Sequence, residues 1–413
     1  MSPAFGLDHI RRALIALGNP QDEIPPAIHI TGTNGKGSAG AFIRAMAEAA
    51  GLKVHVFTSP HLIRVNERIR VASELVSDDV LAETLTKIAA RTQGLTYFEA
   101  LTASAFLLFA RTPADLSIIE VGAGGATDAT NVMARPAACL ITPISLDHES
   151  MFGVTGIAEI AKLKSGILRA GVPAIIADQP AEALDVIRAI AADTNSPLSH
   201  SGKDWRAGWR DGAFVYEGRQ ALRAPELGLS GAHQSHNAGA ACAVIEALAD
   251  PRITSAAMVA GLAVASWPAR LQKLKAGPLT EGFAGTIWVD AAHNPGGAAV
   301  LAEAINERAD PVVLIFACQA VKDVASVLRE LAPAVSRLIA CPLPDSGGQE
   351  GGAGAGPLAI ADAARAVGMQ VSVAMSLQAA VAAAKALQTT RIYISGSLYL
   401  CGAALAANHE RVA

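Results

Sequence analysis

Aromatic side chains are scarce in this sequence, and neither sign of charge dominates it. Only 4% of the 413 residues are aromatic, whereas 51% are hydrophobic and 37 residues are glycine. This composition favours helices packed closely on sheets over a β-sandwich. The formal net charge of -4 provides no basic surface for a long stretch of nucleic acid or for an acidic membrane. A small anionic substrate would need a local positive site.

Cysteine pairs and long hydrophobic runs are also missing. An odd number of scattered cysteines without a C-x-x-C pair suggests neither a disulfide framework nor a zinc site. The cysteines are Cys139, Cys242, Cys318, Cys341 and Cys401. The longest weakly polar stretches, such as 256–265, are shorter than the roughly 18 to 20 apolar residues that span a bilayer.

The segment MSPAFGLDHIRRALIAL at 1–17 is typical of an amphipathic helix and lacks the pattern of a secretion signal. Together with the scattered cysteines, it indicates a reducing compartment. We therefore expect a cytoplasmic protein whose partners include neither a membrane nor nucleic acid.

The length of the chain predicts two domains, because a single hydrophobic core stops growing at roughly 250 to 300 residues. From residue 27 onward, short β-branched runs alternate with longer helical patterns, which is typical of parallel α/β folds. We predict a wound, mostly parallel sheet domain at 1–274, a linker at 275–281 and a smaller Rossmann-like α/β domain at 282–413.

The alternation also predicts the individual elements. In the first domain the expected strands are 27–30, 54–57, 116–121, 138–144 and 174–176. The expected helices there are 38–50, 77–91, 98–110, 157–165, 233–248 and 254–265, with a few antiparallel strands at 201–229. In the second domain the expected strands are 286–289, 312–316, 337–340, 370–373 and 391–394, separated by helices that begin at 297, 323, 357 and 376. The glycine-rich segment 345–356 is expected to be a surface loop.

A glycine-rich turn between a strand and a helix is the strongest local signal. The segment IHITGTNGKGS at 28–38 allows backbone N–H groups to face a phosphate, and the helix N-terminus adds partial positive charge. Lys36 can reach the outer phosphates of a nucleotide. The pattern departs from the usual P-loop because Gly37 separates Lys36 from Ser38. We predict a nucleotide phosphate site that also includes Asn34 and Gly35.

Polar side chains follow several of the other strands. Glu120 ends a buried strand and precedes a glycine-rich loop, and an acid at that place suits a magnesium ion beside a nucleotide. Ser59 follows an earlier strand and His148 follows a later one, and a neutral imidazole can bind metal. Lys164 lies on a predicted helix, where an ordinary lysine would be solvated. Each of these residues taken alone also fits a structural role.

The segment LTYFEALTASAF at 95–106 places Tyr97 and Phe98 at the start of an apolar helix. Aromatic residues at this position often pack into the core, and they can also stack on a flat ring of a ligand. The residues alone leave both alternatives open.

Taken together, these motifs resemble the dihydrofolate synthase/folylpolyglutamate synthase family of the Mur ligase superfamily. The resemblance is carried by GTNGKGS, TSPHL, TYFE, the Glu120 strand end, HQSHN, WPAR and VDAAHNP, and it extends from about 28 to 402. It implies an enzyme, an ATP-dependent ligase that adds L-glutamate to dihydropteroate, to reduced folates or to both through an acyl phosphate. The family is usually monomeric, which implies a monomer here.

The resemblance also implies roles for residues. Ser59 and Glu120 would bind one Mg²⁺, and His148 and a Lys164 carbamylated by CO₂ would bind a second. The implied catalytic residues are Lys36, His148, Lys164 and Arg270. The implied ATP-binding residues are Asn34, Gly35, Lys36, Gly37, Ser38, Asn237, Arg270, Asp290 and His293. The implied acceptor-binding residues are Thr96, Tyr97, Phe98, Glu99, Thr127, Asp128 and Ala129.

The chain departs from the family pattern at a few positions. Ala123 replaces a bulky aliphatic residue, Ala126 and Thr127 replace an arginine-leucine pair, and Leu163 replaces a glutamate. The sequence leaves open which acceptor is used and how many glutamates are added. The alternatives are a Mur-type ligase that acts on a UDP-muropeptide, against which the TYFE and TSPHL segments argue, and a non-catalytic nucleotide-binding regulator.

Overall fold

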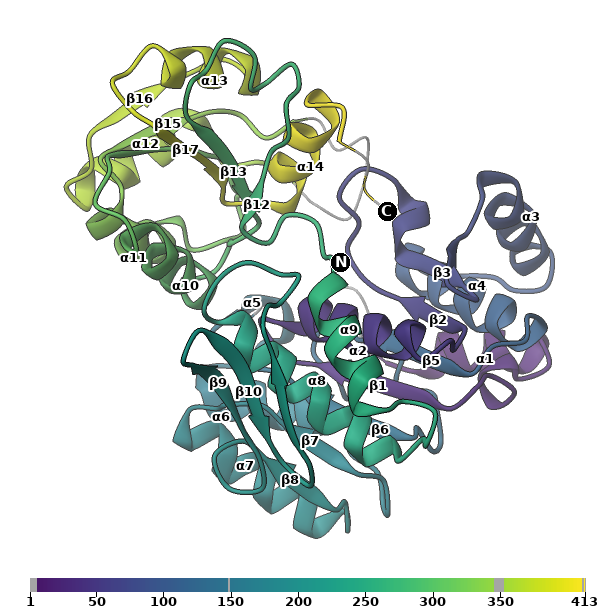
Figure 1. Ribbon diagram of the computed structural model, residues 1–413. Helices are drawn as coiled ribbons and strands as arrows, with labels where there is room; N and C mark the ends of the chain where they lie inside the picture. The colour runs from purple at the N-terminus through teal and green to yellow at the C-terminus, as the bar shows by residue number, and fades with distance from the viewer. Residues whose placement is uncertain (1–5, 148, 345–352, 411, 413) are drawn as a thin grey trace. The chain divides into compact units, whose positions relative to one another are not determined.

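The computed structural model describes residues 6–147, 149–344, 353–410 and 412 (Figure 1). The chain forms two compact units. The first comprises Met1–His61, Val65–Leu229 and His233–Trp267, and the second comprises Leu62–Arg64, Ser230–Ala232 and Pro268–Ala413. The division at Trp267 and Pro268 comes before the domain end that we predicted at 274, and the predicted linker at 275–281 belongs to the second unit.

An eight-stranded sheet organises the first unit, in the order β4-β3-β2-β5-β1-β6-β7-β8. Its strands are β1 Ala27–Thr31, β2 Val54–Phe57, β3 Ile69–Val71, β4 Glu74–Leu75, β5 Leu116–Glu120, β6 Ala138–Ile141, β7 Ala174–Ile176 and β8 Leu198–His200. All pairings are parallel except those of β3 with β2 and with β4. The predicted wound, mostly parallel sheet is confirmed.

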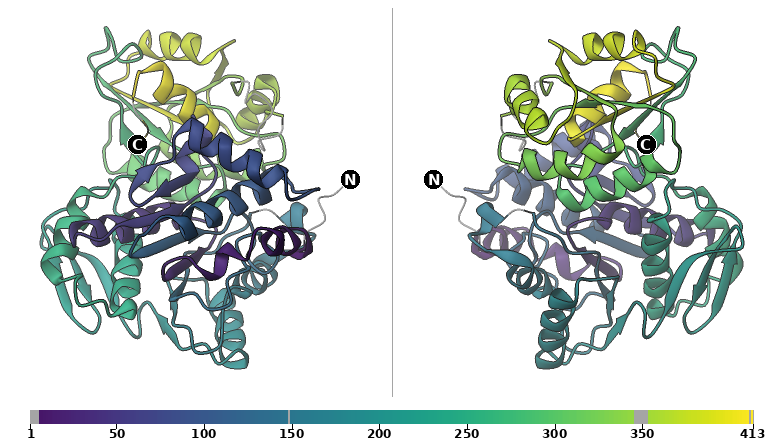
Figure 2. Two further views of the ribbon diagram at one scale, coloured as in Figure 1. Left: turned by 90° about the vertical axis from the view of Figure 1, so that its right-hand side faces the viewer. Right: turned by 90° about the vertical axis from the view of Figure 1, so that its left-hand side faces the viewer.

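Helices cover both faces of this sheet (Figure 2). They are α1 Asp8–Ala16, α2 Lys36–Ala49, α3 Asp78–Ala89, α4 Tyr97–Arg111, α5 Glu149–Phe152, α6 Gly156–Ser165, α7 Ala181–Asp193, α8 Gln234–Leu248 and α9 Ser255–Val264, with short 3₁₀ turns at Pro20–Asp22 and Val65–Arg68. Side chains that alternate along β1 explain the two layers. Ile28 and Ile30 pack under α2, α8 and α9, whereas Ala27 packs on the opposite face with α1 and α4.

Two predicted boundaries were wrong, and the structure gives the reason for each. The helix predicted at 38–50 begins at Lys36, because Gly35 closes the preceding loop with a φ of 87° and the helix follows directly. The strand predicted at 138–144 ends at Ile141. Pro143 has no N–H to donate, and its carbonyl oxygen accepts from the N–H groups of Thr33 and Asn34 instead of from a strand.

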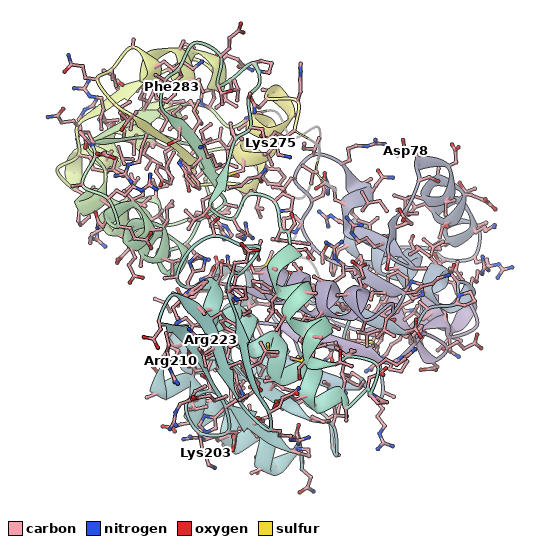
Figure 3. The ribbon with its side chains drawn as sticks, in the orientation of Figure 1. Asp78, Lys203, Arg210, Arg223, Lys275 and Phe283 are labelled. Atoms are coloured by element: carbon pink, nitrogen blue, oxygen red, sulfur yellow. The ribbon has the colours of Figure 1, made fainter. Side chains whose placement is uncertain are left out.

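A small antiparallel sheet decorates the first unit, as predicted for 201–229. It consists of β9 Arg206–Arg210, β10 Ala213–Glu217 and β11 Ala221–Ala224. Its inner face is part of the hydrophobic core beneath α8. Arg210 on the outer face forms two hydrogen bonds to Glu217 across the ladder, at 2.7 and 3.1 Å, and lies among exposed basic side chains (Figure 3).

The second unit is a six-stranded α/β sheet in the order β12-β13-β17-β14-β15-β16. Its strands are β12 Gln272–Lys273, β13 Thr286–Asp290, β14 Val312–Phe316, β15 Arg337–Ala340, β16 Val371–Val373 and β17 Arg391–Ser395. Its helices are α10 Pro295–Asn306, α11 Val324–Leu331, α12 Pro357–Ala366, α13 Leu377–Lys385 and α14 Leu398–Ala407, with a 3₁₀ turn at Ala332–Ala334. Only β12 pairs antiparallel.

Side-chain caps account for most helix starts in the second unit. Asp323 and Ser376 accept from backbone N–H groups and cap α11 and α13, so the helices predicted from 323 and 376 begin one residue later. The helix predicted from 297 begins earlier, at Pro295, because Asn294 caps it by accepting from the N–H of Gly297 at 2.8 Å. Most of the predicted glycine-rich loop, 345–352, lies outside the described residues. No helix in the described part of the chain is long and apolar enough to cross a membrane.

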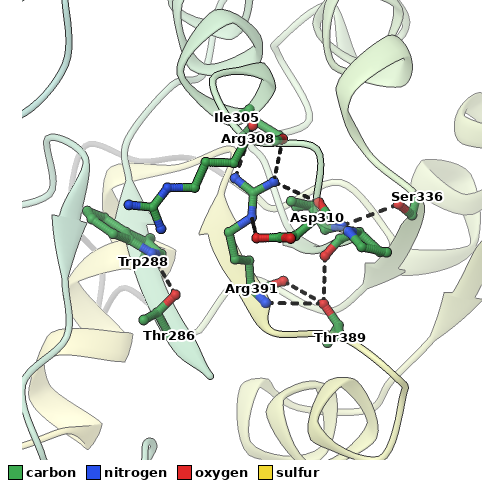
Figure 4. A network of polar contacts seen from close by, with 10 residues as sticks. Thr286, Trp288, Ile305, Arg308, Asp310, Ser336, Thr389 and Arg391 are labelled. Carbon is green, nitrogen blue, oxygen red and sulfur yellow. Dashed lines mark hydrogen bonds and ion pairs between the residues drawn. The ribbon is translucent and has the colours of Figure 1, made fainter. Parts of the chain in front are cut away.

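A buried arginine in the second unit donates hydrogen bonds to several backbone carbonyl groups (Figure 4). Arg391 begins β17 and is 3% exposed. Its guanidinium donates to the carbonyl oxygens of Ile305 at 3.0 Å, Arg308 at 2.9 Å and Asp310 at 2.7 Å. Because the last carbonyl groups of a helix lack intrahelical partners, this side chain satisfies the end of α10 and the loop that follows it.

We predict that Arg391→Met lowers the local stability of the second unit by about 3 kcal/mol, because it leaves three carbonyl groups without their donor. Native-state hydrogen exchange of the β14 and β17 amides measures this loss. Arg365→Met is the control, since Arg365 forms an exposed pair with Asp362 and its loss should cost under about 1 kcal/mol. Equal effects of the two substitutions would contradict the role of Arg391.

Candidate active site

The loop between β1 and α2 has the shape of a phosphate cradle. Gly32 and Gly35 have φ values of 144° and 87°, which favour glycine. A methyl group at Gly32 would collide with the side chain of Thr142, and one at Gly35 would collide with the amide of Asn237. Thr33 and Asn34 donate their backbone N–H groups to the carbonyl of Pro143, at 3.0 and 3.2 Å. The loop is therefore held against the end of β6, and the start of α2 is left to face a ligand.

Two lysines converge on this loop. Lys36 donates from Nζ to the carbonyl oxygens of Gly32 at 3.1 Å and Thr33 at 3.3 Å. Lys164, from α6, donates to the same Gly32 oxygen at 2.8 Å. Lys36 Nζ also lies 3.9 Å from Oε1 of Glu120, at the end of β5. The structure thus brings together Lys36, Glu120 and Lys164, which the sequence places far apart.

The environment of Lys164 favours its neutral form. Its side chain is buried, and its pKa falls from the ordinary value of 10.5 to about 7. Burial is the main cause and the charge of Lys36 adds to it, while Asp147 and Asp128 act in the opposite direction. With this pKa, about half of the Lys164 amines are neutral at pH 7.

The strand register explains why the oxygen ligands lie at one edge. β5 lies between β2 and β1, with Phe57 opposite Ile119 and Ile30 opposite Glu120. Ser59 and Glu120 therefore follow neighbouring strands at the same carboxyl edge as the cradle. Glu120 is 5% exposed and Ser59 is half-buried. A carboxylate and a hydroxyl at this edge fit the oxygen preference of Mg²⁺.

The predicted ligand His148 lies outside the described residues. Its neighbour Asp147 is near enough to Lys164 to affect the pKa of that lysine. Within the described ranges, no three His, Cys, Asp or Glu side chains form a group that could hold a metal. Besides Glu120, a metal at this place would therefore need other kinds of ligand. The predicted set includes two such ligands, the hydroxyl of Ser59 and a carbamylated Lys164.

The start of α4 explains the TYFE segment. Thr96 and Glu99 form a capping box, in which Thr96 N donates to Glu99 Oε2 at 2.8 Å and Glu99 N donates to Thr96 Oγ1 at 3.2 Å. Tyr97 is exposed, with the guanidinium of Arg68 5.6 Å from its ring centroid. Phe98 is half-buried, 5.7 Å from the ring of Phe57. Of the two aromatic residues, Tyr97 is the more available to a ligand, and the contacts of all four with an acceptor stay a prediction.

A buried network that sequence reasoning missed organises the glycine-rich loop after β5. Asp128 accepts from Ala123 N at 3.0 Å, from Thr130 N at 3.0 Å and from Thr130 Oγ1 at 2.5 Å. Thr130 Oγ1 in turn lies 2.9 Å from Nε2 of His29 on β1. Since the Thr130 hydroxyl donates to Asp128, the neutral imidazole donates from Nε2 to Thr130. A histidine in an apolar strand was the only signal of this network in the sequence.

Burial shifts the pKa values of the residues at both ends of the network, His29 and Asp128. It lowers the pKa of His29 to about 3, with help from Arg169, so the imidazole stays neutral. It raises the pKa of Asp128, against the hydrogen bonds from Thr130 and the backbone. Because these bonds already occupy both carboxylate oxygens, Asp128 holds the loop in shape. Thr127 beside it is half-buried, and Ala129 packs into the core with α4.

The same loop is fastened to the helix that carries Lys164. Ala126 N donates to the Leu163 carbonyl at 2.9 Å. Asn131 Nδ2 donates to the carbonyl oxygens of Ala126 and Gly166, at 3.0 and 3.1 Å. The two departures from the family pattern at Ala126 and Leu163 therefore lie in direct contact with each other.

The remaining predicted ATP-binding residues fall into the two units. In the first, Asn237 on α8 packs against Gly35 and donates from Nδ2 to Gln234 Oε1 at 2.9 Å. In the second, Asp290 ends β13 and accepts from Leu271 N at 2.8 Å and Ala292 N at 2.9 Å. Burial raises the pKa of Asp290, and Arg270 and His293 are close enough to oppose this. A common nucleotide site formed by the two groups stays a prediction.

Comparison with known proteins identifies the class of this site. The chain matches the Mur ligase middle domain over residues 30–245 and the Mur ligase, glutamate ligase domain over residues 270–398. The fold is thus that of a Mur ligase, with an ATP-binding α/β domain followed by a second α/β domain.

Individual relatives define the family more closely. A folylpolyglutamate synthase from Lacticaseibacillus casei is 34% identical over 419 aligned residues, which cover 96% of this chain and 93% of the relative. The structure of E. coli FolC in complex with DHPP and ADP superposes with a TM-score of 0.87 at 27% identity, covering 98% and 94% of the two chains. The bifunctional folylpolyglutamate synthase/dihydrofolate synthase from Yersinia pestis, complexed with AMPPNP and Mn, gives a TM-score of 0.84 at 28% identity, covering 98% and 93%. The chain belongs to the folylpolyglutamate synthase/dihydrofolate synthase family.

The low pKa of Lys164 predicts a pH dependence of folding. Between about 7 and 10.5 the unfolded lysine binds a proton that the folded one lacks. The free energy of unfolding should therefore rise with pH in this window, with a slope of up to about 1.4 kcal/mol per pH unit from this group. Lys164→Met should remove that part of the slope, as measured by urea denaturation at pH 7, 8 and 9 in CO₂-free buffer. The control is Lys162→Met, which removes a lysine of the same helix, and identical slopes in all three proteins would contradict the prediction.

Proposed function

We propose that this protein joins L-glutamate to dihydropteroate, to reduced folates or to both, using Mg-ATP. It is an ATP-dependent ligase of folate metabolism. The observation that supports this most directly is the convergence of Lys36, Lys164 and Glu120 on one phosphate cradle, in a chain whose family ligates glutamate.

The chemistry has to make a carboxylate electrophilic. The carboxylate oxygen of the acceptor attacks the γ-phosphorus of ATP, the bond to the bridging oxygen breaks, and ADP leaves. The amine of glutamate then attacks the acyl carbon, an amide bond forms, and phosphate leaves while the amine loses a proton. No nucleophilic side chain is required. Lys36, with Arg270 as its partner in our proposal, neutralises charge on the migrating phosphoryl group.

A divalent metal accompanies the nucleotide. When bound, Mg²⁺ would neutralise charge on the phosphate oxygens of the nucleotide. Glu120 and Ser59 would supply oxygen ligands for one ion, and a ring nitrogen of His148 and the oxygens of a carbamylated Lys164 would hold a second. The glycine-rich loop fixes the distance between these groups, because it is bonded both to β1, through Thr31 and Gly124, and to α6, through Ala126 and Leu163.

The carbamate on Lys164 is supported by the state of its amine. CO₂ reacts only with a neutral amine, and the lowered pKa of about 7 supplies that form. The carbon of CO₂ bonds to Nζ, one proton is released, and the product is an anion that can bind metal. Its negative charge also lies close to Lys36, which donates to the same Gly32 carbonyl as Lys164 does.

We predict that activity depends on CO₂. Exhaustive removal of CO₂ should lower the turnover by about tenfold or more, and added bicarbonate should restore it, because a neutral lysine binds metal less well than its carbamate. The measurement is the initial rate of phosphate release with and without bicarbonate. The Lys164→Ala variant should release phosphate slowly both with and without bicarbonate. A wild-type rate that is independent of bicarbonate, together with no extra mass on Lys164, would exclude the carbamate.

Asn237 and Asp290 are the residues that we assign to the nucleoside, and His293 follows Asp290 in the same loop. The acceptor is assigned to Tyr97, Phe98 and the loop at 127–129. We also propose that the protein acts as a monomer in the cytoplasm. All five cysteines are free and buried, as expected for a chain in a reducing compartment.

The test of the function is phosphate release from Mg-ATP with dihydropteroate or tetrahydrofolate, with and without L-glutamate, and with the products identified by mass. We expect glutamate-dependent release and a mass gain of one glutamyl residue on at least one acceptor. Turnover on a UDP-muropeptide alone would favour a Mur-type enzyme. ATP binding without turnover on any acceptor would favour a regulator.

Glu120→Gln keeps the shape of the side chain and removes its charge. We expect the turnover to fall by about 100-fold or more, because a neutral amide is a poor magnesium ligand beside Lys36. Raising the Mg²⁺ concentration should recover part of this loss. Glu182→Gln, at an exposed position in the first turn of α7, is the control away from the cradle. Unchanged turnover in Glu120→Gln would remove Glu120 from the metal site.

A further inference from the structure

No side-chain cap stabilises the first turn of α2. Its N-cap is Gly35, which provides no side-chain hydrogen bond. In the first unit Ser77, Thr96 and Thr254 cap α3, α4 and α9, whereas α1, α6, α7 and α8 also lack a side-chain cap. Gly37 adds further backbone freedom within that turn. The nucleotide site needs this turn to be ordered, because its N–H groups are the ones that face a phosphate.

An indole ring covers this turn. A methyl group on Gly37 would lie 2.5 Å from Nε1, 2.6 Å from Cε2 and 2.8 Å from Cζ2 of Trp267. Any side chain at 37 would therefore overlap the ring. The glycine that separates Lys36 from Ser38, and that distinguishes this loop from the usual P-loop, is required by Trp267.

The packing of α9 on α2 explains how Trp267 reaches the cradle. Gly261 of α9 lies against the backbone of Met46, near the end of α2, where a methyl group would be 2.5 Å from Met46 N. The chain then runs back along α2 towards its start. Gly228 fixes the path by donating its N–H to the Leu262 carbonyl at 2.8 Å. Trp267 thus arrives at the first turn of α2, packed against the core of the first unit.

We propose that Trp267 is a positioning residue for the nucleotide: its indole packs on Gly37 and orders the first turn of α2, so that the N–H groups there are preorganised for the phosphates. This inference rests on the proposed function, because it assumes that a nucleotide binds at the cradle. Trp267 is also the last residue of the first unit before Pro268. The segment that joins the two units is therefore anchored directly on the phosphate loop.

A double-mutant cycle tests the pair. Trp267→Ala should weaken Mg-ADP binding by about tenfold, equivalent to roughly 1.4 kcal/mol, and Trp267→Phe should weaken it less. Gly37→Ala should weaken binding at least as much, because its methyl group collides with the ring. In the double variant the methyl group occupies the space that the indole leaves, so the two losses should not add. Calorimetric titration with Mg-ADP measures all four proteins.

Two controls accompany the cycle. Gly40→Ala, in the same helix, places a methyl group at ordinary contact distances of 3.6 Å from Ile30 and Ile118, and it should bind Mg-ADP like the wild type. Trp209→Ala removes an exposed tryptophan far along the chain and should also leave binding unchanged. The KM for tetrahydrofolate should stay within about twofold in Trp267→Phe while the KM for ATP rises, a split that general destabilisation would not produce.

Mg-ADP binding by Trp267→Ala at wild-type affinity, or additive losses in the double variant, would overturn the inference. If Trp267→Ala does not fold, the comparison of Gly37→Ala with Gly40→Ala and with Trp267→Phe still decides it. Equal binding by all three would then reject the role of the indole. Failure of the wild type to bind Mg-ADP would reject the proposed function itself, and the inference with it.

Discussion

One carbonyl oxygen, that of Gly32, is the point on which the site depends. It accepts hydrogen bonds from both Lys36 and Lys164, so two amines meet at the turn that a phosphate has to enter. Two ammonium groups at this spacing in a buried place are unfavourable. Burial, and after it the charge of Lys36, lowers the pKa of Lys164, and the neutral amine that results is the reactive form that the proposed carbamate requires.

The rest of the first unit holds this arrangement in place. β5 supplies Glu120 beside Lys36, and the loop after β5 is rigid because Asp128, Thr130 and His29 form a buried chain of hydrogen bonds. Asn131 ties the same loop to the turn that follows Lys164. Preorganisation of this kind matters in phosphoryl transfer, where positioning and electrostatics supply most of the rate. Ala126 and Thr127, at which the sequence departs from the family pattern, lie in this loop, whose shape these hydrogen bonds maintain.

Close packing of small residues makes such a site possible. At several places the chain approaches so closely that only glycine fits, as at Gly32 against Thr142, Gly35 against Asn237 and Gly37 against Trp267. Each contact joins the phosphate loop to a different neighbour: the end of β6, the helix α8 and the segment after α9. At the cradle, glycine is required because backbone atoms and not side chains have to face the ligand.

The sequence by itself determined the order of the elements and the position of the glycine-rich loop between β1 and α2. Apolar periodicity placed the strands, and local motifs pointed to the cradle and Glu120, because these signals depend on neighbouring residues. Lys164 was singled out only by the resemblance to a family. Boundaries such as the end of β6 at Ile141 depended on partners distant in the chain and could not be predicted from local patterns. Only the tertiary structure decided that Lys164 shares a carbonyl with Lys36, that His29 supports Asp128, and that Trp267 requires a glycine at 37. Each of these contacts joins residues that are far apart in sequence, and their burial, which sets both pKa values and steric limits, exists only in the folded chain.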